Sequence, residues 1–324
     1  MLKNFGLWML IASCGWAGWL GTGAAQSFPV KPVRLLVPFA PGGGTDLMAR
    51  ALQDPVAQLL GQPLIVENKP GAGGSVAARE VARSTPDGHT LVFVNNGYLI
   101  APLLQKDAGY DPVRDFEPVA LISVAPLLLV THSSVPARDV EGLLAYARAQ
   151  SAGIEYGSAG IGTLGHIATE LFARSADIKV VHVPYKGSAP AANAVIAGEV
   201  KFTLTAASTA MLGQVKAGRL RLLGVSSPEE SPVAPGIPPI AKTVKGFSSE
   251  LWYAILAPAG TPPHVADTLA KVLNRALAAQ EIRQKFLSFG VEARTGTGDD
   301  LKRRITGDLA TLTRVVREAD IRPE

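Results

Sequence analysis

Short runs of apolar and β-branched residues alternate with segments of helical periodicity along almost the whole chain. This alternation predicts an α/β protein with largely parallel sheets, because parallel strands are joined by crossovers that are usually helices. The predicted strands cover residues 33–39, 64–66, 90–94, 119–123, 127–131, 179–183, 201–205, 220–225 and 252–256. The predicted helices cover residues 46–60, 75–83, 138–149, 163–174, 189–197, 263–279 and 299–317.

Two interruptions divide this series into parts. Pro126 breaks the apolar run 120–134 into a predicted pair of strands, after which a second α/β series begins. A segment rich in proline and glycine, 226–247, leads into the strand that opens at Trp252. We therefore expect a discontinuous first lobe of residues 26–124 and 252–324, a second lobe of residues 125–251, and two hinge crossings. Small ligands usually bind in the cleft between two such lobes.

Residues 1–25 have the layout of a cleavable secretory signal. Lys3 precedes an apolar run, and small residues end at Ala24 and Ala25. We predict export to the periplasm with cleavage after Ala25, which would remove Cys14, the only cysteine of the chain. Two alternatives stay open: a retained membrane anchor, because the apolar run is nearly long enough to span a bilayer, and a lipoprotein attached at Cys14.

The composition and charge of the chain limit the kinds of partner that we expect. The chain has 324 residues, of which 47% are hydrophobic, so it can bury a large core. Its formal net charge is +4, and the basic residues are scattered along the sequence. This distribution is typical of a solvated surface and predicts no nucleic-acid partner.

The stretch VPFAPGGGTDLMAR, residues 37–50, runs from a predicted strand through three glycines into a predicted helix. Its spacing matches neither a Walker phosphate loop, which needs a lysine, nor the G-x-G-x-x-G of dinucleotide sites. It predicts a helix capped near Thr45 or Asp46 whose free backbone N–H groups can receive a small anion. An ordinary strand-to-helix turn would have the same pattern.

Two further turns repeat this arrangement. YGSAGIGTLGH, residues 156–166, contains a literal G-x-G-x-x-G, but no acidic residue follows about 20 residues later to bind a ribose. In it, Ser158 and Thr163 offer hydroxyls, and Thr163 is a predicted helix cap. His166 and Glu170 are four residues apart but have no third metal ligand at suitable spacing. HVPYKGSAPAANAV, residues 182–195, is the third turn. Three helix N-termini that converge on one cleft suit a carboxylate.

The sequence contains little evidence of a catalytic site. There is no G-x-S-x-G elbow, and no motif ties a histidine to a serine and an acid. We therefore expect no enzyme, no cofactor and no metal site.

Six blocks of sequence, in order, resemble the periplasmic solute receptors of tripartite tricarboxylate transporters, the Bug or TctC family. They are FPVKPVRLLVPFAPGGGTDLMAR, VENKPGAGGSVAAREVARSTPDGHTL, YDPVRDFEPVALI, YGSAGIGTLGHIATELF, VHVPYKGSAPAANAVIAGEV and WYAILAPAGTP. The resemblance implies a monomeric, two-lobed binding protein with a type II-like Venus-flytrap fold. It also implies that the protein captures a small carboxylate and delivers it to the membrane subunits of such a transporter. A receptor that signals to a membrane sensor kinase, and an enzyme using the same cleft, are the alternatives.

The resemblance also implies which residues bind the ligand, chiefly through backbone groups, hydroxyls and ordered waters. In the first lobe they are Phe39, Pro41, Gly43, Gly44, Thr45 and Asp46, and in the second Ser158, Gly162, Thr163, His166, Tyr185 and Lys186.

Two positions depart from the family pattern. Thr205 stands where an acid is common, which argues against amino-acid ligands, and Asn95 with Asn96 adds amides near the cleft. We predict a di- or tricarboxylate or a related organic acid.

Overall fold

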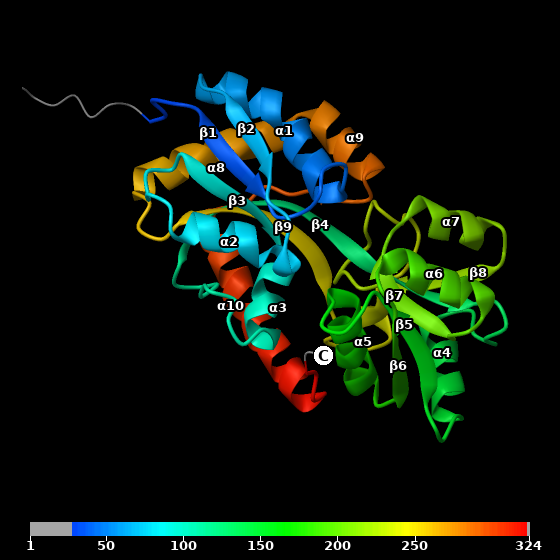
Figure 1. The fold of residues 1–324 in the computed structure, drawn as a ribbon. Helices are drawn as coiled ribbons and strands as arrows, with labels where there is room; N and C mark the ends of the chain where they lie inside the picture. The colour runs from blue at the N-terminus through cyan, green and yellow to red at the C-terminus, as the bar shows by residue number, and fades with distance from the viewer. Residues whose placement is uncertain (1–27, 323–324) are drawn as a thin grey trace, which may run out of the picture.

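The computed structural model describes residues 28–322. The predictions about the signal peptide, cleavage after Ala25 and lipidation at Cys14 lie outside these residues. Figure 1 shows two lobes connected by long strands, with helices covering the sheet of each lobe. The predicted α/β, two-lobed fold class is confirmed. The residue boundaries assigned to the lobes stay a prediction.

The first lobe is built on the sheet β2–β1–β3–β9–β4, with β10 added against β4. Its strands are β1 (Val33–Val37), β2 (Leu64–Asn68), β3 (Thr90–Asn95), β9 (Glu250–Pro258) and β10 (Glu292–Ala293), together with the first part of β4 (Phe116–His132). Its helices are α1 (Gly44–Leu60), α2 (Ser75–Ala82), α3 (Gly97–Leu104), α8 (Pro263–Ala278), α9 (Gln280–Ser288) and α10 (Gly298–Glu318).

The second lobe is built on the rest of β4, which pairs with β7 and with β8, followed by β5 and β6. Its strands are β5 (Ile154–Ser158), β6 (Val180–Pro184), β7 (Phe202–Ala206) and β8 (Leu220–Val225). Its helices are α4 (Val140–Arg148), α5 (Leu164–Ala176), α6 (Ser188–Ala197) and α7 (Thr209–Lys216).

Both sheets are mixed, so the prediction of largely parallel sheets is wrong. Strands β1, β2 and β3 are parallel, as are β5, β6 and β7. Every pairing of β4 and β9 is antiparallel. These two strands pass between the lobes and pair directly with each other, so no crossover helix sets them parallel.

The predicted strand pair at 119–123 and 127–131 is one continuous strand, β4. Pro126 is the last residue of β4 that pairs with β9, and Leu127 is the first that pairs with β7. The Leu127 N–H donates to Ser226 Oγ at 2.8 Å. Proline is tolerated here because its missing N–H falls where the strand leaves one ladder and enters the next.

The sequence analysis missed α3, α7, α9, β5 and β10. Helix α3 reads GYLIAPLL, which is apolar on all sides and contains Pro102, so it shows no amphipathic period. Strand β5 contains Glu155 and Gly157, which hide its β pattern.

Strands of both lobes are buried on their two faces. In β1, Leu35 packs toward the cluster under α1 and α8, whereas Leu36 packs toward the cluster under α2, α3 and α10. In β4, Leu129 and Val130 alternate in the same way between the two clusters of the second lobe. This double burial explains why the strands read as continuous apolar runs. Within residues 28–322, no helix has the length and apolar character needed to cross a bilayer.

Candidate ligand-binding site

A cavity of about 600 Å³ lies between the lobes and is bounded by elements of both. The first lobe contributes the turn after β1, the end of β3 and residues of α3. The second contributes the β5–α5 turn and the end of β6. The volume falls in the range of small-molecule sites. The predicted site residues that line the cavity are Phe39, Asn95, Gly162, Thr163, Tyr185 and Lys186.

The glycine turn after β1 reaches the cavity through Phe39. Pro41, Gly43, Gly44, Thr45 and Asp46 are not among its lining residues. Helix α1 begins at Gly44, and its N-cap is Gly43, which has no side chain to cap with. The prediction of a cap at Thr45 or Asp46 is therefore wrong, because the glycines themselves take the extended and left-handed conformations that start the helix.

The side chain of Asp46 stabilises this turn. Its buried carboxylate accepts hydrogen bonds from the Gly42 N–H and from Asn68 Nδ2, both at 2.9 Å, and pairs with Arg50 at 3.0 Å. Burial opposes ionisation, but the hydrogen bonds from Arg50, Gly42 and Asn68 outweigh it and lower the pKa of Asp46. The anion at this helix N-terminus is thus a side chain of the protein.

The turn between β5 and α5 lines the cavity with Gly160, Ile161, Gly162 and Thr163. Thr163 is the N-cap residue of α5, as predicted, but its hydroxyl donates to the Gly160 carbonyl at 2.8 Å and makes no cap bond to the helix. Ser158 is buried and does not line the cavity. Its Oγ accepts from the Gly160 N–H at 3.1 Å. Both hydroxyls hold the backbone of the turn.

Two stacked histidines lie beneath this turn. His166 and His182 have ring centroids 3.8 Å apart, and the Tyr156 ring also stacks on His182 at 4.9 Å. His166 Nδ1 accepts from the Gly162 N–H at 3.1 Å, and His182 Nε2 lies 2.6 Å from Ser158 Oγ. Burial lowers the pKa of both imidazoles to about 4, and the neighbouring His182 adds to the effect on His166. The neutral pair supports the turn from below, and neither ring lines the cavity.

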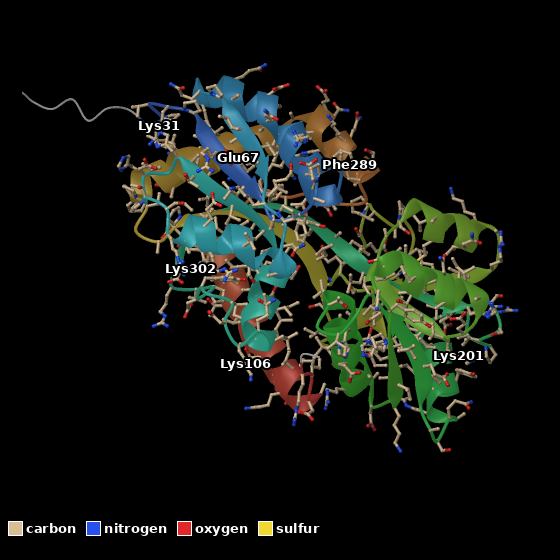
Figure 2. The ribbon with its side chains drawn as sticks, in the orientation of Figure 1. Lys31, Glu67, Lys106, Lys201, Phe289 and Lys302 are labelled. Atoms are coloured by element: carbon tan, nitrogen blue, oxygen red, sulfur yellow. The ribbon has the colours of Figure 1, made fainter. Side chains whose placement is uncertain are left out.

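The turn after β6 lines the cavity with Pro184, Tyr185 and Lys186. The Tyr185 N–H donates to the Ser158 carbonyl at 3.0 Å, and the Gly187 N–H donates to the Ala159 carbonyl at 3.1 Å. These bonds tie the second and third turns into one surface. Lys186 is exposed and is the only charged side chain that residues 28–322 contribute to the lining. Figure 2 shows the labelled Lys31, Lys106, Lys201 and Lys302 spread over both lobes.

Helix α3, which the sequence pattern does not predict, forms a wall of the cavity next to Asn95 and Asn96. Asn95 Oδ1 accepts from the Gly97 N–H at 2.8 Å at the start of this helix. Asn96 is buried: its Nδ2 donates to the Glu250 carbonyl at 3.1 Å, and its Oδ1 accepts from the Trp252 N–H at 2.9 Å. Asn96 therefore joins α3 to β9.

Thr205 lies in β7 opposite Leu128 and is not among the residues that line the cavity. No group of three or more histidine, aspartate or glutamate side chains suited to a metal ion occurs within residues 28–322.

Comparison with known proteins gives consistent matches. The family model TctC, described as the tripartite tricarboxylate transporter family receptor, matches residues 48–321. A UPF0065 protein of Bordetella pertussis is 33% identical over 325 residues, which cover 100% of both chains. Protein BugT of the same organism is 31% identical over 301 residues, which cover 91% of each chain.

Solved structures of similar proteins agree with this match. The periplasmic binding protein BugD is 30% identical with a TM-score of 0.70, and the alignment covers 92% of this chain and 100% of BugD. R. palustris Rpa4515 with adipate is 32% identical, with a TM-score of 0.74 and the same coverage. MatC from Rhodopseudomonas palustris with bound malate is 30% identical, with a TM-score of 0.69, covering 89% of this chain and 100% of MatC.

Proposed function

Because this chain belongs to the TctC family of tripartite tricarboxylate transporter receptors, we propose that it captures a small carboxylate outside the cytoplasmic membrane. The protein then delivers the ligand, as a monomeric periplasmic receptor, to the membrane subunits of such a transporter. The family is one of periplasmic solute-binding receptors, and relatives have been solved with adipate and malate.

One observation carries the proposal: three strand-end turns meet at a single interlobe cavity, to whose lining residues 28–322 contribute one lysine and no carboxylate. An anion there is attracted by Lys186 and repelled by no lining side chain. Ile161 and Lys186 also have backbone N–H groups without a partner among residues 28–322, and such groups are suitable donors to a carboxylate.

Calorimetry with matched acids and amides tests the proposal. We expect at least one of hexanoate, adipate and malate to bind, and its amide to bind about 100-fold more weakly, because hydrogen bonds to a charged group are lost. Lys186→Met should slow association with the acid at low salt and have less effect at high salt. Lys216→Met, an exposed lysine of α7 outside the cavity, is the matched control. Equal affinity for acid and amide, or no binding by any of these acids, would contradict the proposal.

Uptake by deletion strains tests the transport role. Deletion of the gene should abolish uptake of the bound acid, and so should deletion of the membrane subunits of its transporter. Normal uptake in the first strain would contradict a role in transport.

A further inference from the structure

Two chemically different kinds of group line the cavity. Lys186, the unpartnered N–H groups and the turn backbone are polar, whereas α3 and its neighbours contribute mainly apolar side chains. On the α3 side, Ile100 and Ala101 are buried, and Leu104 extends this apolar surface. Leu164 from α5 and Leu251 from β9 line the same cavity.

The apolar side chains of this wall come from both lobes and lie together. Leu104, Ile161 and Leu164 pack against the same hydrophobic cluster, to which Ile100 belongs. A methyl group added to Gly162 would overlap Leu104 Cδ1, so α3 reaches across to the second-lobe turn. An apolar surface that continues from one lobe to the other would enclose the part of a ligand that lies away from Lys186.

Most amide atoms on the α3 wall already have hydrogen-bond partners, and Asn95 Nδ2 is the exception within residues 28–322. Both ends of the Asn96 amide bind β9. Gln105 Oε1 accepts from Ser75 Oγ at 3.2 Å, and Gln105 Nε2 donates to the Ala72 carbonyl at 3.3 Å. Asn95 Oδ1 is held by the Gly97 N–H. A hydroxyl or second carboxylate of the ligand placed here would lose water and gain few partners, which is costly.

From this asymmetry we infer that the ligand is an organic acid with a single carboxylate followed by an apolar aliphatic or aromatic body. This inference rests on the proposed function. It departs from the sequence-based expectation of a di- or tricarboxylate and selects the related organic acids instead. The carboxylate is held at the turns near Lys186, and the apolar body lies against Ile100, Leu104 and Leu164, where burial of its surface favours binding.

Three acids test the inference on the wild-type protein by calorimetry. Hexanoate and adipate have the same number of carbons but one and two carboxylates, and malate adds a hydroxyl to a shorter dicarboxylate. We expect hexanoate to bind at least about tenfold more tightly than adipate, and by a larger margin than malate, because the second charge would be buried against Ile100, Leu104 and Leu164, which offer it no hydrogen bond. Adipate or malate binding as tightly as hexanoate would overturn the inference.

A wall variant gives a second measurement. Ile100→Thr places a hydroxyl on the apolar wall and should weaken hexanoate binding about tenfold, while reducing the preference for hexanoate over adipate. Ile65→Thr makes the same change at an exposed side chain of β2 and should leave both affinities unchanged. An unchanged preference in a folded Ile100→Thr protein would also overturn the inference.

The outcomes separate this inference from the function on which it rests. Hexanamide binding as well as hexanoate, or no binding by any acid, would contradict the carboxylate receptor itself. Adipate or malate binding better than its amide and as tightly as hexanoate would support the receptor and contradict only the single-carboxylate ligand.

Discussion

At the scale of single residues, several side chains predicted to touch the ligand instead support the turns that line the cavity. Ser158 and Thr163 direct their hydroxyls to Gly160, and His166 accepts from the Gly162 N–H. Residue type and position indicated that these groups matter near the cleft. They could not indicate which neighbour each hydrogen bond uses, because those neighbours are set by the fold.

The buried histidine pair predicts a dependence of stability on pH. The pKa of each imidazole falls from 6.5 to about 4 on folding. The unfolded chain therefore takes up these protons first, and stability is complete above pH 6.5 and is lost as the pH falls toward 4. His166→Asn, which keeps an acceptor for the Gly162 N–H, should reduce this loss in urea unfolding at a series of pH values. His264→Asn, on an exposed part of α8, should not change it.

The same position tests the role of His166 in holding the turn. His166→Leu removes the acceptor and leaves the Gly162 N–H unsatisfied, which should weaken binding of the acid by about 1 to 3 kcal/mol. His166→Asn should restore most of this affinity at neutral pH. Wild-type affinity in a folded His166→Leu protein would show that the ring does not position the turn.

At the scale of elements, the contact between α3 and the β5–α5 turn brings the two walls of the cavity together. Leu104 ends α3, and Gly162 opposite it has a φ of +73°, a conformation that favours glycine. Glycine is needed here both for its backbone and for the close approach of Leu104.

Gly162→Ala should therefore weaken ligand binding, because the added methyl group strains the turn and pushes α3 away. Gly213→Ala in α7, where nothing lies within 4 Å and φ is not positive, is the matched control and should bind normally. In a double-mutant cycle with Leu104→Ala, we expect Gly162→Ala to cost about 1 kcal/mol less than in the wild type. Strict additivity in calorimetric affinities would indicate that the two residues do not meet in the bound state.

At the scale of the whole molecule, β4 and β9 are the connections on which we expect the lobes to close. Trp252 lies fully buried on β9, where its Nε1 donates to Asp308 Oδ2 of α10 at 2.6 Å. Helix α10 reaches the second lobe, since Arg174 Nη2 donates to the Glu318 carbonyl at 2.7 Å. Closure would change the packing around this strand from both sides.

The emission of Trp252 should shift when the acid binds. Residues 28–322 contain no other tryptophan, because Trp8, Trp16 and Trp19 fall in the predicted signal peptide. A protein that lacks residues 1–25 thus has one tryptophan fluorophore, and its spectrum can be compared directly with calorimetry. Trp252→Phe supplies the background signal. An unchanged spectrum with an acid that calorimetry shows to bind would contradict the hinge at β9.

The sequence by itself determined the elements whose signal is local. The apolar runs of β1 and β3 and the amphipathic periods of α8 and α10 appear in the pattern of residues, because burial against a sheet imposes that pattern. The three glycine turns could also be predicted, because their backbones adopt conformations that favour glycine. Together with the resemblance of six ordered blocks, they were enough to predict the family and a cleft for an anion.

Only the tertiary structure decided which groups face the cavity. It joined the halves of β4 across Pro126, because that proline sits between two ladders contributed by distant strands. It placed α3, an apolar helix without amphipathic periodicity, as a wall of the cavity. It also stacked His182 on His166 beneath the turn. These outcomes depend on partners distant in the chain: Ser226 lies 99 residues from Leu127, and Trp252 lies 156 residues from Asn96. A local pattern carries no information about such partners, and they fix the chemistry of the site.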